Sequence, residues 1–217
     1  LTLAVSDAIP ALLAGNAVIL KPDVQTTLTA LWAVDLLIEA GVPADLIPVV
    51  TGEGPVVGPL VIEEVDYVMF TGSTRVGREV ARRCGERLIG HSMELGGKNA
   101  MIVRADADIE RASEIAVRAS FSNSGQLCIS MERIYVHEGV YEEFAAAFVR
   151  RIEGMKMRPG VAWGADMGSL ISATQVERVL GHLADATTRG ARVLVGGHHR
   201  RDIGPYYVEP TVLENVT

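Results

Sequence analysis

The chain has 217 residues, 48% of them hydrophobic, and a formal net charge of −7 at pH 7. The length allows one large or two modest domains, and the apolar share is enough for a sizeable core. The negative charge argues against nucleic acid as a partner, because phosphate binding needs a basic surface. Polar residues interrupt each long apolar run, so we expect no membrane-spanning segment.

Cysteine and histidine usage narrows the expectations further. The two cysteines, Cys84 and Cys128, and the lack of a signal-like start indicate a reducing cytoplasm. The five histidines are scattered without ligand spacing, so we predict no metal site.

The first half of the chain alternates helix-like and strand-like patterns. Residues 1–15 have the pattern of an amphipathic helix, and apolar spacing predicts further helices over 26–40, 55–63 and 75–88. Continuous apolar runs at 17–20, 46–50 and 65–70 are typical of buried parallel strands. This alternation predicts a doubly wound parallel sheet, in which ligands bind at the carboxyl ends of the strands.

The second half also alternates. We expect strands at 100–103, 133–136 and 192–195, helices at 108–120, 141–155 and 174–188, and an extended segment at 206–213. The fold class is therefore α/β, with a Rossmann-type half over residues 1–96 and a second α/β half over residues 97–217. We expect the two halves to pack against each other, with the reactive cleft between them.

Two polar stretches follow predicted strands in the first half. Lys21-Pro22-Asp23-Val24 follows the first strand, and a turn that contains Gly72 and Ser73 follows the third. A Gly/Ser turn that opens a helix favours an anion such as a pyrophosphate, although plain helix capping explains it equally well. Gly72 and Gly77 have Walker spacing, but Arg78-Glu79 follows, so a P-loop is not expected.

A small polar segment, 122–126, leads from a predicted helix to Cys128. Most lone cysteines are small buried hydrophobes, which is the reading we keep for Cys84 in helix 75–88. Upstream, Glu94 precedes the pair Gly96-Gly97, where the backbone is able to pass close to a ligand. A thiol and a carboxylate suit a mechanism in which one attacks carbon and the other moves protons.

These two stretches carry a family resemblance. Residues 121–128 read Phe-x-x-x-Gly-Gln-x-Cys, followed by Glu-Arg-Ile, and residues 94–99 read Glu-Leu-Gly-Gly-Lys-Asn. The pattern resembles the aldehyde dehydrogenase superfamily, and the likeness runs along the whole chain. The resemblance implies that Cys128 is the nucleophile, that Glu94 is the base, and that Leu95 lies along a nicotinamide. It also implies that Gly72 and Ser73 lie beside the cofactor phosphates.

The resemblance favours NADP as the cofactor, with NAD possible. Lys21, beside Pro22, stands where the family's lysine meets the adenosine ribose. Members that use NAD often have Glu where this chain has Val24, and a carboxylate there would repel a 2′-phosphate. Val24 removes that repulsion, while the neighbouring Asp23 leaves the preference open until its direction is known.

Substrate and context follow from the resemblance alone. Residues 21–27 and 128–133 most resemble bacterial sequences described as NADP-dependent succinate-semialdehyde dehydrogenases, with benzaldehyde-type members as an alternative. The resemblance implies a chain truncated at both ends, taken from a parent that is a homo-oligomer. A nucleotide-binding fragment without turnover is a second reading. A cysteine hydrolase is a third, and it would need a histidine partner, for which His137 is the nearest candidate.

Overall fold

The computed structural model describes residues 2–216 of the chain and divides into two compact units, Leu1–Gly96 (unit 1) and Gly97–Thr217 (unit 2). Each unit is described by itself. Among the helices in the described part of the chain, none is long and apolar enough to cross a membrane.

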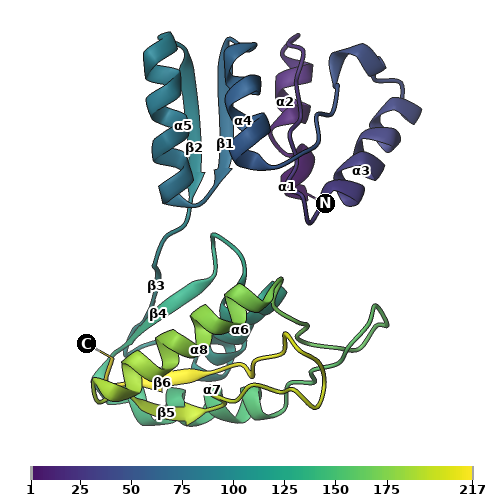
Figure 1. Ribbon diagram of the computed structural model, residues 1–217. Helices are drawn as coiled ribbons and strands as arrows, with labels where there is room; N and C mark the ends of the chain where they lie inside the picture. The colour runs from purple at the N-terminus through teal and green to yellow at the C-terminus, as the bar shows by residue number, and fades with distance from the viewer. Residues whose placement is uncertain (1, 217) are drawn as a thin grey trace. The chain divides into compact units, whose positions relative to one another are not determined.

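Unit 1 contains a parallel strand pair and the helices around it (Figure 1). Its elements are α1 (Thr2–Val5), α2 (Ala8–Leu13), α3 (Thr27–Glu39), η1 (Ala44–Leu46), α4 (Gly54–Glu63), β1 (Tyr67–Gly72), α5 (Thr74–Arg87) and β2 (Gly90–Leu95). Strands β1 and β2 pair in parallel from Tyr67–Gly90 to Gly72–Leu95, with α5 as the crossover between them. A parallel pair needs such a crossover, so the helix and the pairing imply each other.

The expectation of a single helix at the start of unit 1 is wrong. Residues 1–15 do not form one helix, because α1 ends at Val5 and α2 begins at Ala8; residue 1 lies outside the described residues. The physical reason is Pro10, which has no N–H and would clash with the carbonyl of Ser6 in a continuous helix. In the separate helix α2, Pro10 stands in the first turn, where no intrahelical acceptor is needed.

The expected strands at 17–20 and 46–50 are reduced to one parallel bridge, between Leu20 and Val49. The pairing has the expected direction, since the N–H of Val18 donates to the Leu46 carbonyl at 2.8 Å and that of Leu20 to the Pro48 carbonyl at 2.9 Å. The ladder stays short because Pro48 offers no N–H and residues 44–46 form a 3-10 turn instead. Around this bridge a small apolar core forms, whose buried members are Ala8, Val34 and Ile47.

Unit 2 begins with a second parallel pair. Its elements are β3 (Asn99–Val103), α6 (Ile109–Phe121), η2 (Ser122–Gly125), β4 (Met131–Val136), η3 (Glu138–Val140), α7 (Tyr141–Glu153), α8 (Ala173–Thr188), β5 (Arg192–Val195) and β6 (Val212–Glu214). Strands β3 and β4 are parallel and α6 connects them, whereas β5 and β6 are antiparallel. The expected extended segment at 206–213 becomes strand only in β6, and a single bridge joins Val208 to His199.

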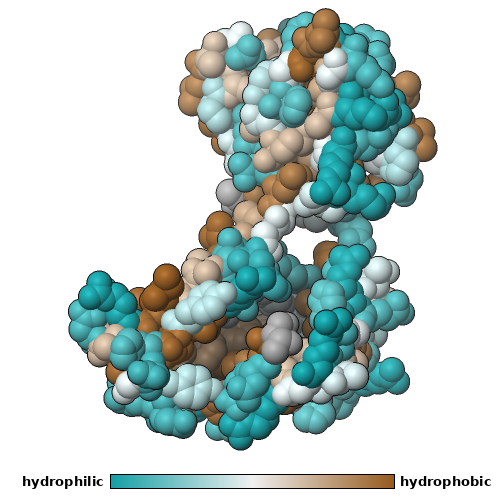
Figure 2. Space-filling model, turned by 90° about the vertical axis from the view of Figure 1, so that its left-hand side faces the viewer, coloured by the Kyte–Doolittle hydropathy of each residue, from teal (hydrophilic) through white to brown (hydrophobic). Residues whose placement is uncertain are grey.

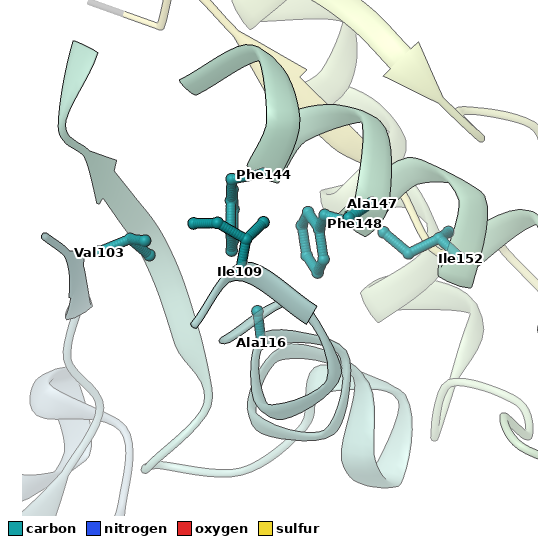
Figure 3. Close-up of a cluster of buried hydrophobic side chains, with 7 residues drawn as sticks. All are labelled: Val103, Ile109, Ala116, Phe144, Ala147, Phe148 and Ile152. Carbon is teal, nitrogen blue, oxygen red and sulfur yellow. The ribbon is translucent and has the colours of Figure 1, made fainter. Parts of the chain in front are cut away.

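The core of unit 2 is formed by side chains from α6, α7 and the parallel pair of β3 and β4 (Figure 3). Its buried members are Val103, Ile109, Ala116, Phe144, Ala147, Phe148 and Ile152. The ring of Phe148 stacks on Phe144 at 5.6 Å and on Phe121 at 6.3 Å between centroids. The single apolar face expected for helix 141–155, with Phe144, Phe148 and Ile152 on it, is confirmed by their burial.

A hydrogen bond and an ion pair on Glu214 join the start of α7 to β5 and β6. The Tyr141 hydroxyl, at the start of α7, donates to the Glu214 carboxylate, and Arg192 of β5 pairs with the same carboxylate. The hydrogen bond to Glu214 raises the pKa of Tyr141 to about 12. The neutral hydroxyl therefore stays a donor throughout the physiological pH range.

Both units leave large apolar side chains exposed, and brown apolar patches are visible on each of them in Figure 2. Examples are Leu28 on α3, Leu88 after α5 and Trp163 between α7 and α8, which are 83%, 93% and 99% exposed. Contiguous exposed apolar patches are typical of surfaces that bind other proteins.

We predict that Phe148→Ala lowers the free energy of unfolding by about 3–5 kcal/mol, because it removes a buried ring and leaves a cavity among close-packed neighbours. Urea-induced unfolding of the variant measures this change. Trp163→Ala, an aromatic deletion at a fully exposed position of the same unit, should change stability by less than about 0.5 kcal/mol. Equal losses in the two variants would contradict the assigned core.

Candidate functional site

The register of β1 and β2 brings four of the predicted site residues to one edge. Gly72 pairs with Leu95, and Thr71 pairs with Glu94, so the carboxyl ends of both strands lie side by side. Ser73 follows β1 directly and begins α5. Gly72, Ser73, Glu94 and Leu95 therefore share the strand ends of unit 1, where parallel sheets bind ligands.

The turn into α5 combines capping with free donors. Ser73 Oγ accepts the Val76 N–H at 3.3 Å, so its side chain is a helix N-cap, as the simpler interpretation expected. Within the described residues, the N–H groups of Thr74 and Arg75 have no acceptor. Together with the helix dipole they suit a phosphate group.

Gly77 sets how closely α5 approaches β2. A Cβ at this position would lie 2.7 Å from Leu95 Cδ2, and Gly77 itself is buried. The missing side chain lets the helix rest on Leu95 and holds that residue in place. The glycine at position 77 thus serves the packing of α5 on β2.

The segment 21–24 follows the Leu20 bridge and is held by its own backbone. Lys21 Nζ donates to the Pro22 carbonyl at 2.7 Å. The carboxylate of Asp23 accepts the Gln25 N–H at 2.9 Å, and its carbonyl accepts the Thr27 hydroxyl at 3.0 Å. The direction of Asp23 is thereby known, because its carboxylate faces the N–H of Gln25, just before α3. Val24 is 44% exposed.

Cys128 of unit 2 is an exposed free thiol, in contrast to Cys84, which is 0% exposed. The expectation that Cys84 is a core residue is confirmed, and burial raises the pKa of its thiol. The segment before Cys128 has left-handed backbone at Asn123, Ser124 and Gly125, with φ of 52°, 58° and 72°. Left-handed conformation at non-glycine residues costs free energy and persists where neighbours hold it.

The amide of Gln126 supplies part of that hold. Its Oε1 accepts the Ile171 N–H at 2.9 Å, and its Nε2 donates to the Asn123 carbonyl at 3.1 Å. Nearby, the Ser124 hydroxyl donates to the Gly168 carbonyl at 3.1 Å. The turn before Cys128 is thus fastened to the segment that precedes α8.

A second amide, that of Asn99, holds the chain on the other side of Cys128. Its Nδ2 donates to the carbonyls of Cys128, at 2.6 Å, and Ser130, at 2.9 Å. Lys98 pairs with Glu132 beside it, so the Glu132 carboxylate has a partner that the sequence did not reveal. Asn99 belongs to the family motif, but no role for it was predicted from the sequence; its position after Gly96-Gly97-Lys98 was the available signal.

Neither the cavity in unit 2 nor any cluster of potential metal ligands in the described residues adds a further group to the candidate site. A cavity of about 440 Å³ lies between the ends of α6 and α7, and none of the predicted site residues lines it. Among residues 2–216, no group of three or more His, Cys, Asp and Glu side chains is arranged to hold a metal ion. Glu94 belongs to unit 1 and Cys128 to unit 2.

A profile of the aldehyde dehydrogenase family matches residues 1–217. The chain belongs to the aldehyde dehydrogenase family. A Mycolicibacterium smegmatis protein named "Putative succinate-semialdehyde dehydrogenase (NADP(+))" is 54% identical over 217 residues, which are 100% of this chain and 42% of that protein. The chain thus spans less than half the length of this curated relative of the aldehyde dehydrogenase family.

Solved structures agree with the family assignment. An NADP-dependent enzyme of E. coli is 40% identical with a TM-score of 0.91, covering 96% of this chain and 44% of the other. PnpE from Pseudomonas sp. WBC-3, solved with nicotinamide adenine dinucleotide, is 37% identical with a TM-score of 0.88, covering 94% and 43%. The aldehyde dehydrogenase resemblance and the α/β fold class, with its Rossmann-type parallel pairing, are therefore confirmed.

We predict that iodoacetamide alkylates Cys128 in the folded protein and spares Cys84. Only Cys128 is exposed, and burial both blocks Cys84 and raises its pKa, which keeps the reactive thiolate scarce. Peptide mass spectrometry after a timed reaction measures both sites, and unfolding in urea should make both react. Alkylation of Cys84 ahead of Cys128 without unfolding would contradict the assignment of the two thiols.

Proposed function

We propose that the protein oxidises an aldehyde to a carboxylic acid, with Cys128 as nucleophile, Glu94 as general base and NADP as the preferred hydride acceptor. The observation that carries the proposal is an exposed thiol on a turn held by two side-chain amides, in a chain of the aldehyde dehydrogenase family. A nucleophile needs access and a fixed direction, and this turn provides both.

The reaction begins at sulfur. The Cys128 thiolate adds to the aldehyde carbon and forms a thiohemiacetal, whose oxyanion needs hydrogen-bond donors. Within the described residues the Cys128 N–H has no acceptor, so it is free to donate to that oxygen. The bound nicotinamide supplies the hydride acceptor, and the loss of hydride leaves a thioester on Cys128.

Glu94 completes the turnover. Its carboxylate is exposed at the end of β2 and accepts a proton from water, which then attacks the thioester carbon. The carboxylic acid leaves and the Cys128 thiolate is restored. Acid–base assistance of this kind contributes about 10²–10⁴-fold to a rate.

The residues of unit 1 fit a dinucleotide. The free N–H groups at the start of α5, after Gly72 and Ser73, would hold its phosphates, and Leu95 would lie along the nicotinamide. Lys21, next to Pro22, would meet the adenosine ribose. The Asp23 carboxylate accepts the Gln25 N–H and keeps its charge, so the proposed preference for a 2′-phosphate rests on Val24 and Lys21. NAD remains the second candidate, since PnpE was solved with it.

Succinate semialdehyde is the leading candidate substrate, on the name of the M. smegmatis relative. Benzaldehyde-type substrates are the alternative that the segment after Cys128 allows. We further propose that the intact protein is a homo-oligomer and works in the reducing cytoplasm that its free thiols fit.

Two rival functions make different predictions. A nucleotide-binding module without turnover would bind NADP yet reduce none with any aldehyde. A cysteine hydrolase would need a histidine at the thiol, whereas His137 Nδ1 accepts the Gly139 N–H and, in the described residues, no histidine is hydrogen-bonded to Cys128. A panel of aldehydes assayed with NAD and NADP in parallel on the intact protein separates these possibilities.

We predict that Glu94→Gln in the intact protein lowers turnover by about 10²–10⁴-fold, because hydrolysis of the thioester loses its base. Mass spectrometry should then find the acyl group on Cys128. Cys128→Ala should show neither turnover nor acylation, whereas Cys84→Ala should retain most activity. Near-normal turnover of Glu94→Gln would remove Glu94 from the mechanism.

Cofactor preference gives a separate prediction. Val24→Glu should shift the ratio of kcat/KM for NADP and NAD toward NAD, because a carboxylate accepts from ribose hydroxyls and repels a 2′-phosphate. Val24→Gln, which has nearly the same shape without the charge, is the matched control and should shift the ratio less. A wild-type protein with the higher kcat/KM for NAD would refute the preference.

A further inference from the structure

Cys128 stands at the corner of a tight turn. The Ser130 N–H donates to the Leu127 carbonyl at 3.1 Å, which closes a four-residue turn with Cys128 and Ile129 at its centre. Ile129 is 70% exposed and Ser130 is 2% exposed, so the turn projects outward from a buried base. The peptide between the two central residues is the part of such a turn that differs between turn types.

Asn99 holds that peptide. Its amide has two N–H groups, and Nδ2 donates to the Cys128 carbonyl at 2.6 Å and to the Ser130 carbonyl at 2.9 Å. The first of these carbonyls belongs to the central peptide of the turn. Rotation of this peptide would change ψ of Cys128, and it would have to break the hydrogen bond to Asn99.

The strand pairing explains how Asn99 reaches the turn. Asn99 is the first residue of β3 and is paired with Met131, the first residue of β4. The register shifts between Asn99 and Ala100, and regular pairing continues from Ala100–Arg133 onward. The backbone ladder is irregular where the turn begins, and there the side-chain amide of Asn99 makes the connection.

We propose that Asn99 is a positioning residue for Cys128, a role that rests on the proposed function. Asn99 contacts the backbone of Cys128 and makes no hydrogen bond to its sulfur, so it would act through the direction of the thiol. Gln126 fixes the chain before Cys128 and Asn99 fixes the chain after it. The two amides would hold the sulfur in line with the aldehyde carbon without burying it.

This role differs from a contribution to folding alone. The ladder of β3 and β4 continues to Val103–Val136, and the buried core of unit 2 does not include Asn99. Loss of the amide should therefore loosen the turn and leave the sheet intact. A small displacement of a reacting group is enough to cost up to about 10² in rate.

The test compares Asn99→Ala with Asn16→Ala in the intact protein. Asn16 also donates its Nδ2 to a backbone carbonyl, that of Ala11 at 3.1 Å, but it lies after α2 and outside the proposed site. For Asn99→Ala we expect kcat for aldehyde oxidation to fall by about 10–10²-fold, with the KM for NADP unchanged. Asn16→Ala should retain the wild-type kcat. Hydrogen exchange should become faster in the peptide around Cys128 and stay unchanged in α7.

The outcomes separate the two proposals. If the wild type and Asn16→Ala reduce no NADP or NAD with any aldehyde, the proposed function fails and the positioning role fails with it. If they are active and Asn99→Ala matches them, only the positioning role fails. A parallel loss of kcat, NADP binding and Tm in Asn99→Ala would mark a merely structural residue. If Asn99→Ala does not fold, Asn99→Leu decides, because Leu has a similar size and no N–H to donate: wild-type kcat there would overturn the role, and a lower kcat with unchanged KM supports it.

Discussion

Parallel strand pairing is the constraint on which both candidate sites depend. A parallel pair needs a connection that crosses the sheet, and here α5 and α6 provide it. One consequence is that like ends of the strands lie together. In unit 1 the carboxyl ends place Gly72 beside Leu95, and in unit 2 the amino ends place Asn99 beside Met131. The predicted cofactor residues and the predicted nucleophile are thus positioned by the same rule at opposite ends of strands.

Neutral amides, rather than charges, hold the candidate nucleophile. Gln126 and Asn99 anchor the chain on either side of Cys128, and Asn123 and Ser124 take up the left-handed backbone between the helix and the turn. The segment 122–130 contains no charged side chain. Hydrogen bonds from amides fix direction at short range and carry no net charge. Such an arrangement allows an exposed thiol to be held firmly without an ion pair at the sulfur.

Local patterns predicted the helices well and the short strands less well. Helix starts at Ser73, Asp108 and Ser172 each have a side chain that accepts a backbone N–H, and this chemistry is readable from the sequence. Strand β2 (Gly90–Leu95) was not expected, because it contains no Val, Ile or Thr and forms through its pairing with β1. Conversely, the apolar run at 17–20 suggested a full strand, and the prolines nearby left only one bridge.

The sequence by itself determined the chemistry available and the family. Cys128, Glu94 and the glycine-rich turns can be recognised from the sequence, because each motif consists of residues that are close together in the chain. The tertiary structure alone decided which distant groups meet them. Asn99 reaches the Cys128 carbonyl across 29 residues, and Gln126 reaches Ile171 across 45. The partner of an amide depends on strand register and on how loops pack, and neither leaves a periodic mark in the sequence. For the same reason the sequence left open the direction of Asp23, which is settled by one hydrogen bond to the backbone of its own turn.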